Sequence, residues 1–522
     1  MGRKELGIKK LKLTRFDLGY FPNKDFDDVP DGGSPDCKHV LFRDSDLRPF
    51  PGMAQVNTTQ ASNTSGQGIH YINTNGITKR VAVFGDKFYE DVSGVWTDRT
   101  SSVSIGAGDL VKFVDHQIGA NEYVIGTPGG GNPPFKWTGS GDAEDLGGSP
   151  SNFDTIEQYH GHFFGALKEV VSISDVEDPE TWGSTNVLNF DKDVKNLVNN
   201  GSKLAVMMED HIGSVQGFDI LDFVQENSEI RTFGCVGKLA ATNCNWGESD
   251  LKVVATVSRD GLWVFDEAFN GNKVLGNNWF REFNKSNLSK SSLAYWEEEK
   301  LLFMSAPFGS STEPDHLTII NTETGAYWPG PSIHSNYIRA LASMKDSLGN
   351  EFIYYVDNNG YAFRFDMDTT SYHTGAATEA IDYKWRSKRF DLEDIHSLGE
   401  LNMLAGALGN WGVIVGVHFG LSTGDGATGN ISFFQDEDLL GKTFVLGAST
   451  LGSSEYVFSP LVGIGGFGRF LQVTITPQGS AENDVLGTSF ILGESSLGSV
   501  NSFKIKRIEI DLHRHRTGGS EQ

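Results

Sequence analysis

The chain has 522 residues, with 68 acidic and 43 basic side chains and a formal net charge of −25. Such an acidic balance argues against a protein that binds nucleic acid by neutralising its phosphates. Because no run of about eighteen apolar residues occurs, we expect no transmembrane helix, and we expect no secretory signal at an N-terminus without an apolar core. Glycine is frequent, helical periodicity is rare and many short runs alternate, which predicts an all-β fold.

Residues 1–68 predict an extended N-terminal arm followed by a loop. Leu11-Lys12-Leu13 alternates like an edge strand. Glycine, proline and aspartate recur from Phe16 to Pro35, and serine, threonine and asparagine dominate 57–68, as is typical of loops. The arm starts with a basic cluster, Arg3 to Lys12. This cluster either binds an acidic surface of an adjacent copy or ring, or forms a loose solvated tail.

A sequence pattern typical of β-hairpins recurs throughout residues 69–385. Phe163–Leu167 and Val170–Ile173 are apolar runs separated by Lys168-Glu169, a polar break that predicts a tight turn, and Trp182 follows after a polar loop. Similar units recur at a spacing of about forty to fifty residues, which is typical of propeller blades. They lie at 81–96, 123–137, 253–265, 301–328 and 352–365, with a further hairpin at 204–215. We predict a β-propeller over 69–385; a plain β-sandwich with many hairpins is the alternative.

Longer strands follow and predict a separate β-sandwich over 386–522. The expected strands lie at 401–408, 411–417, 444–446, 470–475 and 503–512. Within this region, residues 440–452 resemble residues 486–498, and Gly441, Gly447 and Gly452 match glycines of the second copy. We expect the two copies to form equivalent turns or bulges on neighbouring strands, at positions that need glycine.

Few residues point to chemistry. The loop Gly126–Gly131 is rich in glycine but lacks the lysine and the following helix of a phosphate loop. His160 and His162, two apart on an expected strand, either hold a metal or are ordinary edge histidines without a third ligand. Because Cys37, Cys235 and Cys244 form no metal or redox motif, we expect buried, reduced thiols.

Acidic residues offer the remaining candidates. Asp27-Asp28, Asp175 with Asp178, and Glu297–Glu299 lie in expected loops, and any two carboxylates facing each other across a propeller mouth would suit glycoside hydrolysis. No motif joins a nucleophile, a base and an orienting group. We therefore predict no catalytic residue, no cofactor-binding residue and no metal site, and hence no enzyme.

A series of short motifs runs through the chain in a fixed order. They lie at 18–26, 29–32, 40–44, 47–52, 162–165, 173–175, 178–182, 233–237, 257–263, 355–360 and 375–381. In this order they resemble the tail nozzle or tail hub propeller proteins of tailed bacteriophages. The chain departs from that pattern at Ser45-Asp46, where the family often has glycine. The resemblance covers most of the chain.

The resemblance implies a virion structural protein of a short-tailed phage, made in the host bacterial cytoplasm. It implies a homohexameric ring below the portal and adaptor, with surfaces for tail fibres or a needle and no membrane insertion. Phage DNA would pass through the lumen without specific binding, and an acidic wall would suit that passage. The alternatives are a propeller glycoside hydrolase acting on host surface polysaccharide and a glycan-binding protein.

Overall fold

The computed structural model describes most of the first 388 residues and, beyond them, only strands. The described residues are 9–388 without 14–15, 17, 23, 26–27, 44–45, 63–64, 75–76, 119–120, 149–151, 276–278, 331–336, 347, 367–370, 374–377 and 381–383, followed by 390–391, 412–423, 429–434, 444–446, 456–458, 467–468, 470–477, 488–492 and 503–514. Helix is limited, within these residues, to the short 3₁₀ helices η1 (Phe280–Glu282) and η2 (Lys285–Lys290). The predicted all-β class is confirmed.

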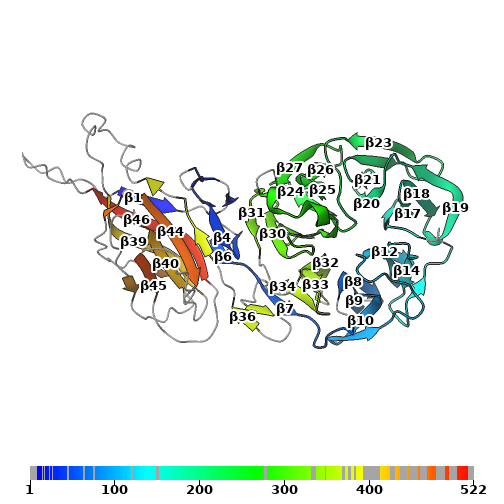
Figure 1. Cartoon of the computed structure of the whole chain (residues 1–522), viewed down its shortest axis with the longest axis horizontal. Coiled ribbons are helices and arrows are strands. Elements are labelled where there is room, and N and C mark those ends of the chain that lie inside the picture. The colour runs from blue at the N-terminus through cyan, green and yellow to red at the C-terminus, as the bar shows by residue number, and fades with distance from the viewer. Residues whose placement is uncertain are drawn as a thin grey trace, which may run out of the picture.

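Seven blades form a propeller in the described part of the chain, and Figure 1 shows them arranged in a ring. Blades one to three comprise β8 (Gly66–Thr74), β9 (Ile77–Phe84), β10 (Lys87–Val92) and β11 (Val95–Asp98); β12 (Lys112–Ile118), β13 (Asn121–Thr127), β14 (Phe135–Trp137) and β15 (Glu144–Asp145); and β16 (Thr155–Tyr159), β17 (His162–Leu167), β18 (Val170–Asp175) and β19 (Asp178–Asn189). The predicted propeller is therefore confirmed, and each predicted hairpin falls within a blade.

The remaining blades follow the same antiparallel order. Blades four to seven comprise β20 (Val194–Asn199), β21 (Leu204–Met208), β22 (Ile212–Gln216) and β23 (Val224–Ile230); β24 (Ala241–Trp246), β25 (Leu251–Ser258), β26 (Gly261–Asp266) and β27 (Gly271–Leu275); β28 (Ser292–Trp296), β29 (Leu301–Ala306), β30 (His316–Asn321) and β31 (Tyr327–Pro329); and β32 (Arg339–Lys345), β33 (Glu351–Val356) and β34 (Ala362–Asp366). In each blade the first strand lies innermost, against the first strands of its neighbours.

The hydrophobic core lies between the blades. Every residue of β21, β29 and β30 is buried, because a middle strand is covered on both faces by adjacent blades. This explains why several of the runs in the sequence are continuously apolar rather than alternating. The tight turn predicted at Lys168-Glu169 is present between β17 and β18, with Lys168 in the left-handed region at a φ of 53°.

The ring is closed by a strand from the N-terminal segment. Strand β7 (Gly52–Gln55) pairs antiparallel with β34, so that Met53 lies opposite Phe365, and it supplies the fourth strand of blade seven. Next to this strand, the Asn57 side chain accepts a hydrogen bond from Ala362 N at 2.7 Å. The sequence predicts an arm and loop for residues 1–68. The structure corrects this prediction at residues 52–55, which complete a blade. Their partner lies about 300 residues away, beyond the reach of a local pattern.

Two further sheets contain the C-terminal strands, in the region for which a sandwich is predicted. The first sheet contains β1 (Lys9–Leu13), β5 (Val40–Arg43), β6 (Asp46–Pro49), β39 (Gly412–Thr423), β42 (Tyr456–Phe458), β43 (Phe467–Gly468) and β46 (Phe503–Arg514). The second contains β4 (Asp36–Lys38), β37 (Lys384–Arg386), β38 (Phe390–Asp391), β40 (Gly429–Phe434), β41 (Phe444–Leu446), β44 (Phe470–Pro477) and β45 (Thr488–Leu492). The expected strand at 401–408 lies outside the described residues, and the domain boundaries near 68 and 385 stay predictions.

Smaller elements complete the description. Strands β2 (Gly19–Tyr20) and β3 (Gly33–Ser34) form a parallel pair, and β35 (Ser371–His373) and β36 (Thr378–Ala380) extend the sheet of blade seven. The basic cluster is only partly described: Lys9, Lys10 and Lys12 lie in β1, whereas Arg3 and Lys4 lie outside the described residues. Within the described chain, we find no helix of the length and apolar character needed to span a membrane.

Candidate functional site

Polar side chains gather around the propeller axis at the end of the ring where the first strand of each blade begins. They include Gln67, Lys112, Thr155, Asn196, Ser292 and Arg339. Direct contacts join these strand starts around the ring, for example between Val111 N and Gln67 O at 2.9 Å and between Leu341 N and the Ser292 hydroxyl at 3.1 Å. We call this end the channel mouth. It is the region of the propeller where buried polar groups from several blades meet.

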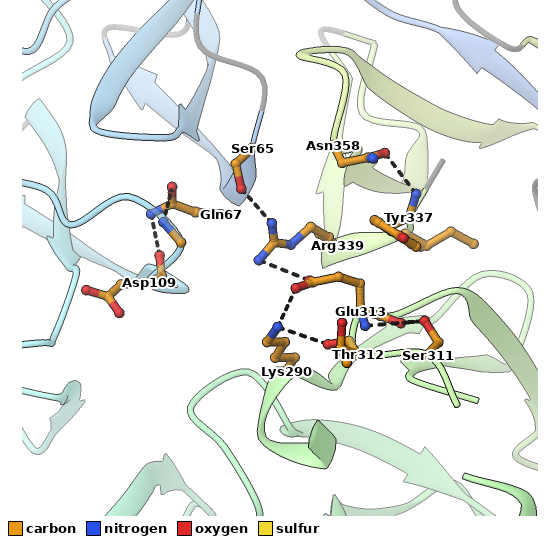
Figure 2. Close-up of polar contacts among 12 residues, drawn as sticks. Ser65, Gln67, Asp109, Lys290, Ser311, Thr312, Glu313, Tyr337, Arg339 and Asn358 are labelled. Atoms are coloured by element: carbon orange, nitrogen blue, oxygen red, sulfur yellow. Dashed lines mark hydrogen bonds and ion pairs between the residues drawn. The ribbon is translucent and has the colours of Figure 1, made fainter. Parts of the chain in front are cut away.

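Arg339 lies at the channel mouth between Ser65 and Glu313 (Figure 2). Its guanidinium donates to the Ser65 hydroxyl at 2.6 Å and lies 3.5 Å from a carboxylate oxygen of Glu313. Glu313 also pairs with Lys290, whose ammonium donates to the Thr312 carbonyl at 2.9 Å. Burial lowers the pKa of Arg339, and the charge of Glu313 opposes this shift. The network therefore joins blades one, six and seven.

Lys112 holds the corresponding position between blades two, three and four. Its ammonium donates to Glu157 Oε2 and Asn196 Oδ1, both at 3.0 Å, and to the Leu197 carbonyl at 2.5 Å. Asn196 is 1% exposed, and its Oδ1 also accepts from the Thr155 hydroxyl at 3.4 Å. Because all three ammonium hydrogens of Lys112 have acceptors, this lysine acts as a cross-link between blades rather than as a reactive amine.

Lys238 is the exception at the channel mouth. Its ammonium donates to the Pro128 carbonyl at 2.8 Å, and the described carboxylates act on it through their charge, without a hydrogen bond. Burial lowers the pKa of Lys238 to about 8, while the charges of Asp154 and Asp109 act in the opposite direction. Lys238 therefore combines spare hydrogen-bond donors with a partly buried position.

The glycine-rich loop lies beside Lys238. Gly129, Gly130 and Gly131 all have positive φ, between 61° and 87°, and Gly129 O accepts from Asn132 N at 3.0 Å. A Cβ added to Gly129 would lie 2.5 Å from the Lys238 ammonium, so glycine allows this close approach. The loop is followed by strand β14, whereas a phosphate loop is followed by a helix.

The two candidate histidines do not converge. His162 begins strand β17, is 2% exposed and lies with Nδ1 2.8 Å from the Ser174 carbonyl. His160 lies in the preceding turn with a φ of 48°, and its ring packs against Phe218 and Tyr159. Among the described residues, no group of three or more His, Cys, Asp or Glu side chains is arranged to hold a metal ion.

The acidic candidates lie away from the channel mouth. Asp175 and Asp178 face each other across the turn from β18 to β19, and hydrogen bonds from Glu180 N and the Thr181 hydroxyl lower the pKa of Asp178. Glu297–Glu299 lie in the turn from β28 to β29. Asp27 lies outside the described residues. The two described groups occupy separate turns, and the two oxygens of the Asp178 carboxylate accept hydrogen bonds from Glu180 N and the Thr181 hydroxyl, shortly after it in the chain.

All three cysteines are free and buried. Burial raises the pKa of Cys37 and Cys235 and raises that of Cys244 to about 12. A buried thiol with a raised pKa is a poor nucleophile, because the thiolate is the reactive form. The cysteines therefore behave as small apolar side chains, in line with their predicted state.

Three comparisons with known proteins were made: with family models, with curated proteins and with solved structures. No family model matches the chain, and no curated protein matches it. Among solved structures, the chain is similar to a selenomethionine-substituted virginiamycin B lyase from Staphylococcus aureus, with a TM-score of 0.39 and 11% sequence identity. The match covers 60% of this chain and 98% of that one. Similarity at this level says nothing about activity.

Sequence reasoning missed the polar side chains of the channel mouth. The available signal is positional: Lys112, Thr155 and Arg339 are each the first residue of a first strand, directly after the connection from the preceding blade. Each is an unremarkable polar residue in the sequence. Only the closed ring brings these strand starts together, so the signal is readable once the blade boundaries are known.

Proposed function

We propose that the protein is a structural component of a phage tail, a nozzle or hub built as a homohexameric ring through which DNA leaves the virion. The observation that carries this proposal is how the N-terminal segment is built into both parts of the molecule. Strand β7 closes the propeller, while β1 and β6 pair with β46 and β4 pairs with β37 among the C-terminal strands.

Side chains strengthen these links. The Phe16 ring packs edge-on against Trp385 at 5.1 Å, and the Ser34 hydroxyl donates to the Arg386 carbonyl at 2.7 Å. In the other direction, Tyr20 packs against Trp279 at 5.3 Å, beside blade six. A segment that is paired and packed on both parts suits a rigid building block better than it suits two parts joined by a flexible linker.

Charge and motif order support the same proposal. A net charge of −25 suits a conduit that does not retain DNA, and the ordered motifs resemble tail nozzle and hub proteins over most of the chain. In this role the partners are further copies of the chain, the adaptor or portal ring, and a fibre or needle. The protein would have no catalytic role, and its location would be the virion.

The test is the state of assembly of the purified full chain. Mass photometry and negative-stain imaging, alone and with the adaptor of the same virion, should show a six-fold ring, and a structure of that ring should show an acidic lumen. A chain that stays monomeric under both conditions would contradict the proposal. So would release of reducing sugar from host surface polysaccharide that a single carboxylate substitution abolishes, since that result would establish a glycoside hydrolase.

A further inference from the structure

One face of the propeller, opposite the channel mouth, consists of turns. It is formed by the turns that join the first strand to the second in blades three to seven and the third strand to the fourth in blades three to six, and we call it the turn face. Contacts link it from blade to blade: His160 with Phe218 at 4.6 Å, Asn200 Nδ2 with Asp266 O at 3.0 Å, Gly247 N with Thr322 O at 2.8 Å, and Glu297 N with Glu351 Oε2 at 2.9 Å. The turns therefore form one continuous surface.

The turn face is strongly acidic. Its described turns contain eleven acidic residues, namely Glu177, Asp219, Asp222, Glu248, Asp250, Glu267, Glu297, Glu298, Glu299, Glu323 and Asp346. They contain two lysines, Lys203 and Lys300, and both are ion-paired, with Glu229 and Asp250. The formal charge of these turns is thus 2 − 11 = −9.

The opposite turns of the same blades provide the comparison. Between the second and third strands, and between successive blades, the described residues contain ten acidic side chains, Glu169, Asp191, Asp193, Glu209, Asp210, Asp260, Glu282, Glu313, Asp315 and Asp357. They contain eight basic ones, Lys168, Lys192, Arg231, Lys238, Arg259, Arg281, Lys285 and Lys290, for a charge of 8 − 10 = −2. The acidic excess is therefore a property of the turn face and not of propeller turns in general.

Exposed apolar side chains gather on the same face. Leu221 is 96% exposed, Leu348 84% and Phe218 73%, and Val176, Val224 and Leu251 are each more than half exposed. Of the large apolar side chains that are exposed in the described parts of blades three to seven, only Leu167 and Val187 lie elsewhere. Apolar side chains collected on one charged face are typical of an interaction surface.

The loop 217–223 presents two of these side chains in a fixed shape. Asp222 Oδ1 accepts hydrogen bonds from Phe218 N at 2.9 Å and Asp219 N at 2.7 Å. Phe223 anchors the loop by packing its ring against Phe164 at 5.2 Å, while Leu221 points away from the core and is almost fully exposed. A loop held in this way loses little conformational entropy when a partner covers it.

We propose that the turn face is a docking surface for a protein segment that carries basic side chains interspersed with apolar ones, with Phe218 and Leu221 as its apolar anchor. The charge selects this chemistry: an acidic face repels nucleic acid and anionic lipid and attracts lysine and arginine. The exposed anchor requires a partner with apolar side chains of its own. The docking surface depends on the fold alone, so it stands or falls separately from the tail assignment.

The experiment uses the full chain and a synthetic peptide of alternating lysine and leucine as the probe. Binding is measured by fluorescence anisotropy, with hydrogen exchange of the complex to locate the site. The double variant Phe218→Ser/Leu221→Ser tests the anchor, and Leu167→Ser/Val187→Ser is the matched control, since it removes two exposed apolar side chains from blade three outside the turn face. The double variant Glu297→Gln/Glu298→Gln tests the contribution of the acidic charge to binding. If the anchor variant has a lowered melting temperature, Val176→Ser, which removes another exposed apolar side chain from the turn face, takes its place.

We expect the anchor variant to weaken binding by about tenfold or more, the scale of a central interface residue. The charge variant should weaken it less and reduce its salt dependence, the control should bind like the parent, and protection should fall on 217–224. Equal weakening by the control, equal binding of a glutamate–leucine or a lysine–serine peptide, or protection elsewhere overturns the proposal. Self-association lost in the anchor variant, or binding of anionic vesicles through this loop, assigns the face to a different occupant and also overturns it.

Discussion

Phe444 and Phe490 lie opposite each other on the adjacent parallel strands β41 and β45, and they hold the same position in the two copies of the glycine repeat. Val445 pairs with Ile491 and Leu446 with Leu492 in the same register. The two copies are therefore neighbours, as predicted. A repeat that pairs with itself in parallel brings equivalent positions of its two copies next to each other in the sheet.

The first prediction concerns those glycines, which lie outside the described residues. Gly447→Val and Gly493→Val should each destabilise the protein by ~1–3 kcal/mol, because valine does not tolerate the positive φ that a turn glycine adopts. Thermal melting of the two single variants measures the effect. Unchanged melting temperatures in both would remove the argument that the repeat exists to provide matching turns.

The second prediction concerns the buried ion pair of the channel mouth. Arg339→Ala should destabilise by about 3 kcal/mol, because it leaves the Glu313 carboxylate without its buried partner and frees the Ser65 hydroxyl. Arg259→Ala is the control, since Arg259 is 68% exposed in its pair with Glu209 and should cost less than about 1 kcal/mol. Urea unfolding distinguishes them, and equal midpoints would refute a structural role for the channel mouth.

The third prediction is a pH dependence. Burial among Phe308, Trp279 and Phe283 lowers the pKa of His316 from 6.5 to about 4. As the pH falls, His316 is therefore protonated near pH 6.5 in the unfolded chain but only near pH 4 in the folded chain. The free energy of unfolding consequently decreases as the pH drops through this window, by roughly 3 kcal/mol in total.

The variant His316→Phe isolates this contribution. Phenylalanine fits the aromatic surroundings and does not titrate, so the loss of unfolding free energy between pH 6.5 and pH 4 should be smaller in the variant than in the parent. Chemical unfolding at a series of pH values gives the two slopes. Parallel slopes would show that His316 is not kept neutral by the fold.

The fourth prediction concerns the basic cluster. Deleting residues 2–12 removes most of β1, whose Lys9–Leu13 pair with Ile508–Leu512 of β46. We expect the propeller to stay folded by circular dichroism, because its blades do not use β1, while the proposed ring formation or the proposed binding to an adaptor weakens. Mass photometry of the deletion variant measures this. Assembly equal to that of the parent would mean that the cluster is only a solvated tail.

The parts of the fold that the sequence revealed are those with local causes. Lys168-Glu169 lies between two apolar runs, so both the strands and their turn are visible within about a dozen residues. The pairing of Met53 with Phe365 has no such local signal, because the residues around Met53 do not indicate which distant strand will pair with them. The interaction of Arg339 with Ser65 was hidden for the same reason: it exists only after the ring closes.

The closing strand sets an order for synthesis. Strand β7 leaves the ribosome early, but its partner β34 ends at Asp366, so the propeller remains an open ring while the intervening blades are made. At roughly 5–20 residues per second, this interval lasts on the order of 15–60 s. Strands β1 and β6 wait longer still, until the carboxyl-terminal β46 emerges. Throughout that time the nascent chain exposes unpaired strand edges, and its yield in the cell should depend on the chaperones that shield them.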